Sequence, residues 1–205
     1  MPRLREATAA FAALDPVMAR LVKEHGPPRG LRTRRTGESR FEQLAEAIAY
    51  QQLAGKAAEA IWRRVRGTVD GSFAPEAVLA AGYDKLRGAG FSNAKALSVL
   101  DLAAKAVDGT VRLERIGRRP DDEIVAELIK VRGIGVWTAE MFLMFTLGRL
   151  DVWPVLDYGV RVGYQRAYGL AAAPTPKALG PLGDRFRPYR SLVAWYCWRV
   201  VAPLP

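Results

Sequence analysis

Two glycines on either side of Ile134 have spacing that suits the binding of an anion. The apolar residues before Gly133 and after Gly135 follow a helical period, so we expect this turn to join two helices. A dinucleotide-binding fingerprint would need a preceding strand and a third glycine, and Thr138 stands at that third position. The free amides at the start of the second helix could instead hold a phosphate.

Asp157 lies in the same segment, residues 131–161, just after a loop that contains Pro154. An aspartate at this position is a good helix N-cap, which stabilises a helix by about 1 kcal/mol. Arg161 is one turn further on and could form an ion pair with it. A carboxylate held near a phosphate-binding turn is also a candidate for chemistry, and the two interpretations are compatible.

The composition favours a polyanionic partner. The 205 residues contain 31 Lys and Arg against 21 Asp and Glu, which gives a net charge of +10. A basic but merely solvated surface is the alternative. Cys197 is the only cysteine and His25 the only histidine, which argues against disulfides, zinc ribbons, iron–sulfur clusters and His-rich sites. The charged N-terminal segment resembles neither a signal peptide nor a membrane span, so we expect a soluble, cytoplasmic protein.

Apolar spacing predicts an all-α protein of about ten helices and no strand. Start signals are Ser39, Pro75, Ser92 or Asn93, and the pair Asp121-Asp122. The predicted helices cover residues 4–24 with a break at Asp15-Pro16, 39–52, 56–65, a stretch after 75, a stretch after 93, 121–129, 136–147, a stretch from 157, and 188–201. The helix over 136–147 is apolar nearly all round, so we expect it to be buried.

Five motifs in order resemble the helix-hairpin-helix DNA glycosylases of the HhH-GPD superfamily, and most of all the 3-methyladenine DNA glycosylase II group. They are QQLAGKAA (51–58), GFSNAKA (90–96), VRGIGVWTAEM (131–141), DVWPVLDYGVR (151–161) and PYRSLVAWYCW (188–198). The well-known bacterial enzymes of this group carry an additional N-terminal α/β domain, which we do not expect in this chain. The resemblance implies an all-α glycosylase unit over residues 1–205, with an active-site cleft between two lobes. The approximate lobes are residues 36–116, and residues 1–35 with 117–205.

The resemblance assigns Asp157 as the catalytic residue. It also implies that the backbone of Gly133, Ile134 and Gly135 holds a DNA phosphate, often through a bound Na+ or K+ ion. Arg132 stands where many relatives have proline, and it could add a phosphate contact of its own or be an ordinary loop arginine. Lys56 is a second candidate for the DNA backbone.

The residues after the hairpin distinguish two subclasses of these enzymes. Bifunctional relatives have a lysine directly after the hairpin, which forms a Schiff base and cuts the backbone. This chain has Val136 and Trp137 there, which implies a monofunctional hydrolase without AP-lyase activity that leaves an abasic site. The single cysteine likewise places it outside the iron–sulfur branch, so no cofactor is expected beyond the hairpin cation.

Aromatic residues match positions that line the base pocket in the glycosylase II group. Trp137 and Trp198 correspond to pocket positions, Met141 replaces a tyrosine, and Tyr158 is a further candidate. Cationic rings are attracted to aromatic faces, so such a pocket would suit a flipped, alkylated base. Core packing is the alternative for each tryptophan, and Trp153 and Trp195 are weaker candidates.

Gln52 and Leu53 resemble the residues that fill the duplex after a nucleotide is flipped out, with Leu53 as the intercalating wedge. Gln52 would continue the apolar stripe of its helix, where an amide is unexpected. Gln51 could contact the opposite base or the backbone. For Leu53 the alternative is a core or capping position at a helix end.

The function implied is monofunctional excision of alkylated purines of the 3-methyladenine type from double-stranded DNA, by base flipping, in base-excision repair. The enzyme would act as a monomer associated with the nucleoid. One alternative is a helix-hairpin-helix protein that binds DNA or lesions without cutting. Another is a glycosylase for deaminated bases such as hypoxanthine.

Overall fold

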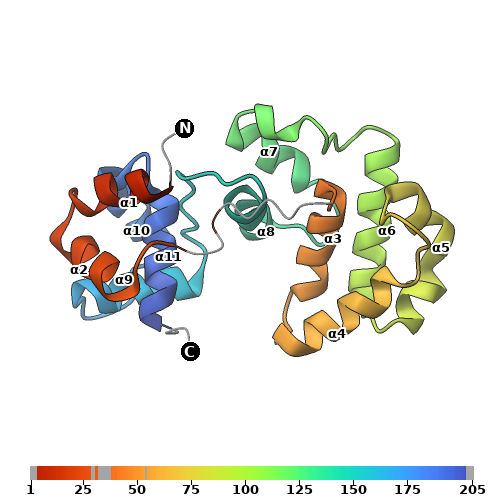
Figure 1. Ribbon diagram of the computed structural model, residues 1–205, viewed down its shortest axis with the longest axis horizontal. Helices are drawn as coiled ribbons and strands as arrows, with labels where there is room; N and C mark the ends of the chain where they lie inside the picture. The colour runs from red at the N-terminus through yellow and green to blue at the C-terminus, as the bar shows by residue number, and fades with distance from the viewer. Residues whose placement is uncertain (1–3, 29–30, 32–37, 54, 202–205) are drawn as a thin grey trace. The chain divides into compact units, whose positions relative to one another are not determined.

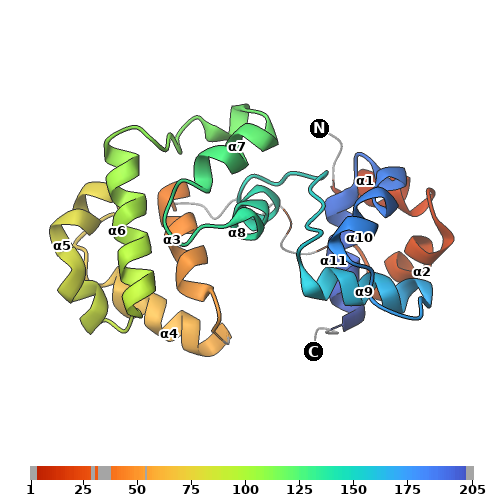
Figure 2. The same ribbon diagram turned by 180° about the vertical axis from the view of Figure 1, so that it is seen from behind.

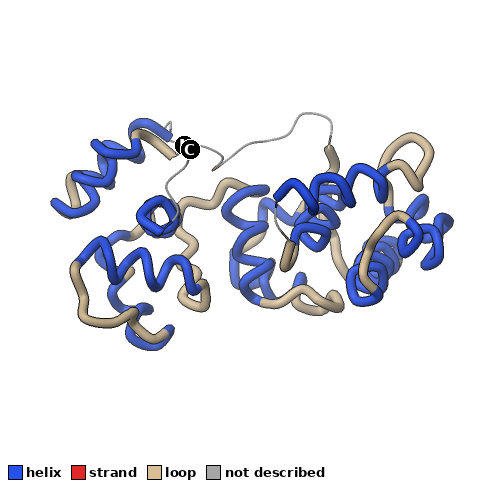
Figure 3. The backbone as a smooth tube through the Cα atoms, turned by 90° about the horizontal axis from the view of Figure 1, so that it is seen from below, coloured by secondary structure: helices blue, strands red, loops and turns tan. Residues whose placement is uncertain are grey.

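The computed structural model describes residues 4–28, 31, 38–53 and 55–201, and the described chain is entirely helical. It forms eleven α-helices and three short segments of other helix types, with no strand in this part of the sequence (Figures 1 and 3). The predicted all-α class is therefore confirmed. Within the described residues no helix is both long enough and apolar enough to cross a membrane.

The chain divides into two compact units. Unit 1 contains residues 1–33 and 143–205, and unit 2 contains residues 34–142. The sequence placed residues 117–142 with the terminal helices, whereas the structure places them with the central ones. The reason is that the turn of the hairpin is bonded to the middle of unit 2, through Asp101 and Gln51.

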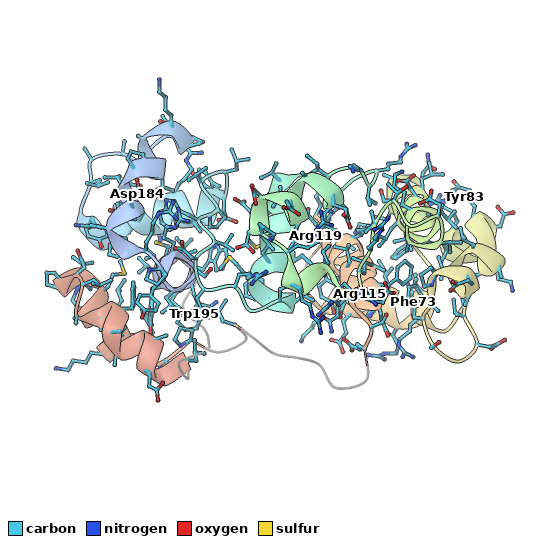
Figure 4. The ribbon with its side chains drawn as sticks, turned by 90° about the horizontal axis from the view of Figure 1, so that it is seen from above. Phe73, Tyr83, Arg115, Arg119, Asp184 and Trp195 are labelled. Carbon is cyan, nitrogen blue, oxygen red and sulfur yellow. The ribbon has the colours of Figure 1, made fainter. Side chains whose placement is uncertain are left out.

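Unit 2 is built on a long central helix. Its elements are α3 (Arg40–Tyr50), α4 (Gly55–Arg66), α5 (Pro75–Gly88), α6 (Asn93–Val107), η1 (Ile116–Arg118), α7 (Asp121–Leu128) and α8 (Val136–Met141). Helix α6 packs against α5 on one side and α3 on the other, an order that is also seen from behind in Figure 2. Phe73, labelled in Figure 4, is buried in the core of this unit. The ring centroids of Trp62 and Phe41 lie 5.0 and 5.9 Å from that of Phe73.

Unit 1 is centred on the C-terminal helix. Its elements are α1 (Leu4–Ala12), α2 (Pro16–His25), α9 (Tyr158–Tyr168), α10 (Pro176–Leu182), η3 (Asp184–Phe186) and α11 (Arg190–Val201). Helix α11 packs against α9 and α2. A Cβ atom on Gly163 would lie 2.1 Å from the carbonyl oxygen of Cys197, so the absence of a side chain allows α9 and α11 to approach this closely.

Hydrogen bonds confirm the predicted helix starts at Ser39 and Ser92, and they show a further cap at Asp15, where only a break between helices was predicted. Asp15 Oδ1 accepts a hydrogen bond from Val17 N at 2.9 Å and caps α2, while Ser39 and Ser92 cap α3 and α6. The acids Asp121 and Asp122 lie in the first turn of α7, where their negative charges stabilise the positive end of the helix dipole.

Two predicted helix ends are wrong. Helix α3 ends at Tyr50, so Gln52 lies beyond it and does not continue its apolar stripe. The helix predicted over residues 136–147 is α8 followed by η2 (Phe142–Thr146), a π-helical segment that contains the boundary between the two units. Hydrophobic spacing identifies a helix, but it does not distinguish α from π hydrogen bonding.

Candidate active site

The hairpin turn requires a glycine at residue 133 for two independent reasons. Its φ angle is +76°, a conformation that L side chains rarely adopt. A Cβ atom there would also lie 2.3 Å from Ser98 Oγ on α6. Gly135 then caps α8 in an extended conformation. The turn is therefore pressed against α6, and helix α8 begins directly after it, as the sequence indicated.

An aspartate on α6 holds the same turn by its backbone. Asp101 Oδ2 accepts a hydrogen bond from Arg132 N at 2.7 Å, and Lys105 pairs with the carboxylate. Partial burial would raise the pKa of Asp101, but the Arg132 amide and the Lys105 ammonium outweigh it and hold the pKa below its usual value. The carboxylate is therefore ionised at neutral pH and keeps the turn in place. The Arg132 residue is exposed, and its role at a phosphate stays a prediction.

The turn after α3 presents the predicted wedge. Leu53 is 39% exposed, which does not suit the alternative of a core residue. Gln52 is exposed and has a φ angle of +56°. Gln51 does not point away from the protein, because its Nε2 donates to Gly133 O at 3.1 Å and to Thr138 Oγ1 at 3.2 Å. The amide nitrogen of Gln51 therefore binds the hairpin, and a contact of Gln51 with DNA stays a prediction.

Asp157 is the N-cap of α9 and is also held by the predicted pocket tryptophan. Its Oδ1 accepts hydrogen bonds from Val160 N at 2.8 Å and from Trp198 Nε1 at 2.9 Å. A Cβ atom on Gly159 would lie 3.0 Å from Trp198 Cδ1 and 3.1 Å from Asp157 Oδ1. A small residue is therefore needed for α9 and α11 to bring the carboxylate and the indole together. Arg161 donates from Nε to Pro174 O at 2.7 Å.

Trp198 is supported on a second aromatic ring. Phe145 in η2 stacks on it, with centroids 5.8 Å apart and an interplanar angle of 27°. The neighbouring Cys197 is fully buried, and burial together with the charge of Asp157 raises the pKa of its thiol. The thiol is therefore protonated at neutral pH, and it is no candidate nucleophile.

The remaining aromatic candidates fall into two groups. Trp137 on α8 is 42% exposed and Tyr158 beside Asp157 is 72% exposed, so neither is a core residue. The second helix of the hairpin was predicted to be buried, but the exposure of Trp137 shows that the first turn of α8 is not. Trp153 and Trp195 are buried, and Trp153 Nε1 donates to Leu179 O at 3.0 Å, so both have structural roles.

The predicted site residues therefore fall into two sets, one in each unit. In unit 2 the turn around Gly133, the wedge at Leu53 and the exposed Trp137 belong to connected elements. Met141 lies at the end of α8 and is partly exposed, and Lys56 is exposed in the first turn of α4. In unit 1 the set contains Asp157, Trp198 and Tyr158. No group of three or more His, Cys, Asp or Glu side chains that could hold a metal occurs in the described ranges.

Replacing Trp198 by Phe tests the hydrogen bond to Asp157 separately from stacking. The phenyl ring can still stack on Phe145, but it has no N–H to donate to Oδ1. A hydrogen bond to a charged group is worth about 1.5–3 kcal/mol, so we expect catalysis at Asp157 to slow by roughly tenfold or more. Single-turnover kinetics of base release from methylated double-stranded DNA measure this. An unchanged rate would show that the Trp198 N–H plays no part in positioning the carboxylate.

A helix-hairpin-helix turn in one unit and a capped, indole-bound aspartate in the other agree with the family comparison. Residues 45–182 match the model of the HhH-GPD superfamily of base excision DNA repair proteins, and the chain belongs to this superfamily. It is 34% identical over 199 residues to DNA-3-methyladenine glycosylase 1 of Schizosaccharomyces pombe, which covers 96% of this chain and 87% of that protein.

Solved structures give the same result. The 3-methyladenine DNA glycosylase of Schizosaccharomyces pombe in complex with abasic DNA superimposes with a TM-score of 0.80 at 32% identity, covering 95% of each chain. A DNA-3-methyladenine glycosidase from Bacillus halodurans superimposes with a TM-score of 0.83 at 31% identity, covering 94% of this chain and 88% of the other.

Sequence reasoning missed the residues that position the site rather than form it. Ser98 and Asp101 on α6 shape the hairpin, and Phe145 supports Trp198. One signal was available, because Gly159 and Gly163 are four residues apart and therefore lie on one face of α9. Two small residues in this arrangement indicate a close helix contact.

Proposed function

We propose that the chain is a monofunctional DNA glycosylase that hydrolyses the N-glycosidic bond of alkylated purines of the 3-methyladenine type. The observation that carries this proposal is the fixed carboxylate of Asp157, whose Oδ1 is held by the Val160 amide and the Trp198 indole. The glycosylases of Schizosaccharomyces pombe and Bacillus halodurans, similar over nearly the whole chain, support the substrate class.

Hydrolysis of this bond needs a negative charge close to the sugar. As the base leaves, positive charge builds on the deoxyribose, and a fixed carboxylate stabilises it. The Asp157 carboxylate also orients or deprotonates the attacking water. An alkylated purine such as 3-methyladenine already carries positive charge and leaves readily, so one carboxylate suffices without a strong general acid.

The proposal includes water as the nucleophile and an abasic site as the product. Val136 and Trp137 occupy the positions after the hairpin where bifunctional relatives have a lysine, so the chain has no amine there to form a Schiff base. We therefore expect no cleavage of the DNA backbone. An assay for strand breaks after base release, without added alkali, tests this part separately.

DNA binding is assigned to the hairpin and its basic surroundings. The amides that follow Gly133 would hold a backbone phosphate, and Arg132 and Lys56 would contribute positive charge. A Na+ or K+ ion at this turn fits the residues present, since backbone carbonyl oxygens are hard ligands. The Gly133 carbonyl accepts a hydrogen bond from Gln51, and a carbonyl oxygen has two lone pairs. Such an ion would add positive charge next to the phosphate.

Base release from methylated double-stranded DNA, with the products identified by chromatography, tests the proposed function. We expect 3-methyladenine among the released bases, from protein acting as a monomer. Release of hypoxanthine alone would favour the deaminated-base alternative. A protein that binds DNA with a steep salt dependence but releases no base would instead be a binding protein.

A further inference from the structure

The turn that carries the wedge has a conformation that must be held by its surroundings. Gln52, with φ at +56°, is the one non-glycine residue with positive φ among the described residues. Positive φ is uncommon for residues with a side chain, and it persists where the neighbouring structure imposes it. Contacts with α6 and with the hairpin provide this support.

Two side-chain contacts with other elements hold the end of α3 and the turn that follows it. Lys95 on α6 donates from Nζ to Ala49 O at 2.7 Å, which satisfies a carbonyl at the helix C-terminus. Gln51 donates to Gly133 O at 3.1 Å and to Thr138 Oγ1 at 3.2 Å. The first contact fixes the turn to α6. The second fixes it to the hairpin, more than 80 residues further along the chain.

We propose that Gln51 is a positioning residue that couples the wedge turn, residues 51–53, to the phosphate-binding hairpin. The inference rests on the proposed function, because it requires that Leu53 enters the DNA duplex and that the hairpin binds a phosphate of the DNA backbone. Through this coupling, the Leu53 wedge lies at a fixed distance from the bound phosphate before any base is flipped. Neither Leu53 nor the hairpin amides need to rearrange when DNA binds.

The chemistry of the amide supports a structural link over a direct DNA contact. Gln51 Nε2 meets one backbone acceptor and one hydroxyl, both on the hairpin side of the turn. Thr138 is 6% exposed, so water has little access to replace the lost donor. A variant at residue 51 that cannot donate leaves a buried acceptor unsatisfied and releases the turn from the hairpin.

Replacing Gln51 by Met tests the coupling, because the side chain keeps its length but loses both hydrogen bonds. The matched control is Gln165→Met in α9, which also loses one side-chain bond to a backbone carbonyl, Ala171 O at 3.4 Å. Base flipping is followed by the fluorescence of 2-aminopurine placed opposite or beside the damaged base, and base release by single-turnover kinetics. We expect about tenfold loss of both for Gln51→Met in a fully paired duplex, and no loss for the control.

A second DNA substrate separates positioning from a general loss of structure. When the damaged base is already mismatched or bulged, little unpairing energy is needed and the wedge matters less. Gln51→Met should then recover most of the wild-type rate. Its salt dependence of binding should stay unchanged, since the hairpin amides still hold the phosphate. An equal loss on paired and unpaired substrates would overturn the proposal, as would an equal loss in Gln165→Met.

Thr138→Val provides the test if Gln51→Met does not fold. It removes one of the two acceptors, so a smaller loss of base flipping is expected than for Gln51→Met. Unchanged base flipping in Thr138→Val would count against the proposal. Failure of the proposed function is distinguishable, because wild-type protein would then release no alkylated purine. The 2-aminopurine signal and the binding of abasic DNA would still report whether Gln51 couples the turn to the hairpin.

Discussion

Asp157→Asn will release alkylated bases at least about a hundredfold more slowly than the wild type, while it binds DNA as well or better. Removal of a group that supplies charge stabilisation and general base catalysis costs roughly 10²–10⁴ in rate. Asn retains a side-chain oxygen that accepts from Val160 N and Trp198 Nε1, and it caps helices as well as Asp. Loss of a negative charge beside DNA favours binding.

Single-turnover base release and binding to methylated duplex measure the two effects in the same variant. Asp184→Asn is the control, because Asp184 is an exposed aspartate of unit 1 whose ion pair with Arg187 is at the surface. It should have wild-type rates. Asp157→Ala should lose activity and also about 1 kcal/mol of stability, because the cap is removed. Full activity in Asp157→Asn would rule out the mechanism.

Gly163→Ala will lower the free energy of unfolding by about 3 kcal/mol, near the upper end for an overpacked core. The added Cβ would lie 2.1 Å from Cys197 O and 2.7 Å from Cys197 Cα, which are backbone atoms that cannot move alone. Helices α9 and α11 must then separate. Because these helices carry Asp157 and Trp198, base release should fall together with stability.

Gly88→Ala is the matched control for this stability measurement. Gly88 lies in the last turn of α5, and a Cβ atom there meets no neighbour within 4 Å. The variant should be as stable as the wild type, or more stable by about 0.5–1 kcal/mol, because alanine loses less backbone freedom on folding. Urea unfolding measures both variants. If Gly163→Ala were as stable as Gly88→Ala, the close contact between α9 and α11 would be disproved.

Features that depend on local interactions could be predicted from the sequence. The caps at Ser39 and Ser92 and the glycine turn before α8 each rest on residues a few positions apart, and the structure contains all three. The family motifs extend this to the fold class. Helix types and ends were less predictable, since α3 stops before Gln52 and η2 replaces the second half of a predicted helix.

Features that depend on tertiary packing could not be predicted in this way. Trp198 reaches Asp157 across 41 residues only because α9 and α11 meet at two glycines. Gln51 finds its acceptors on a hairpin that no local pattern connects to it. The lobe boundary was misplaced for the same reason, since the bonds that join the hairpin to α6 and α3 are long-range.

The buried state of Cys197 has a consequence for the conditions in which this protein would work. Methylating agents that damage DNA also attack protein thiols, and they react with the thiolate far faster than with the protonated thiol. The one cysteine of this chain is fully buried in α11 with a raised pKa. We therefore expect the enzyme to resist the reagents whose products it removes, and to remain active in a cell under alkylation stress.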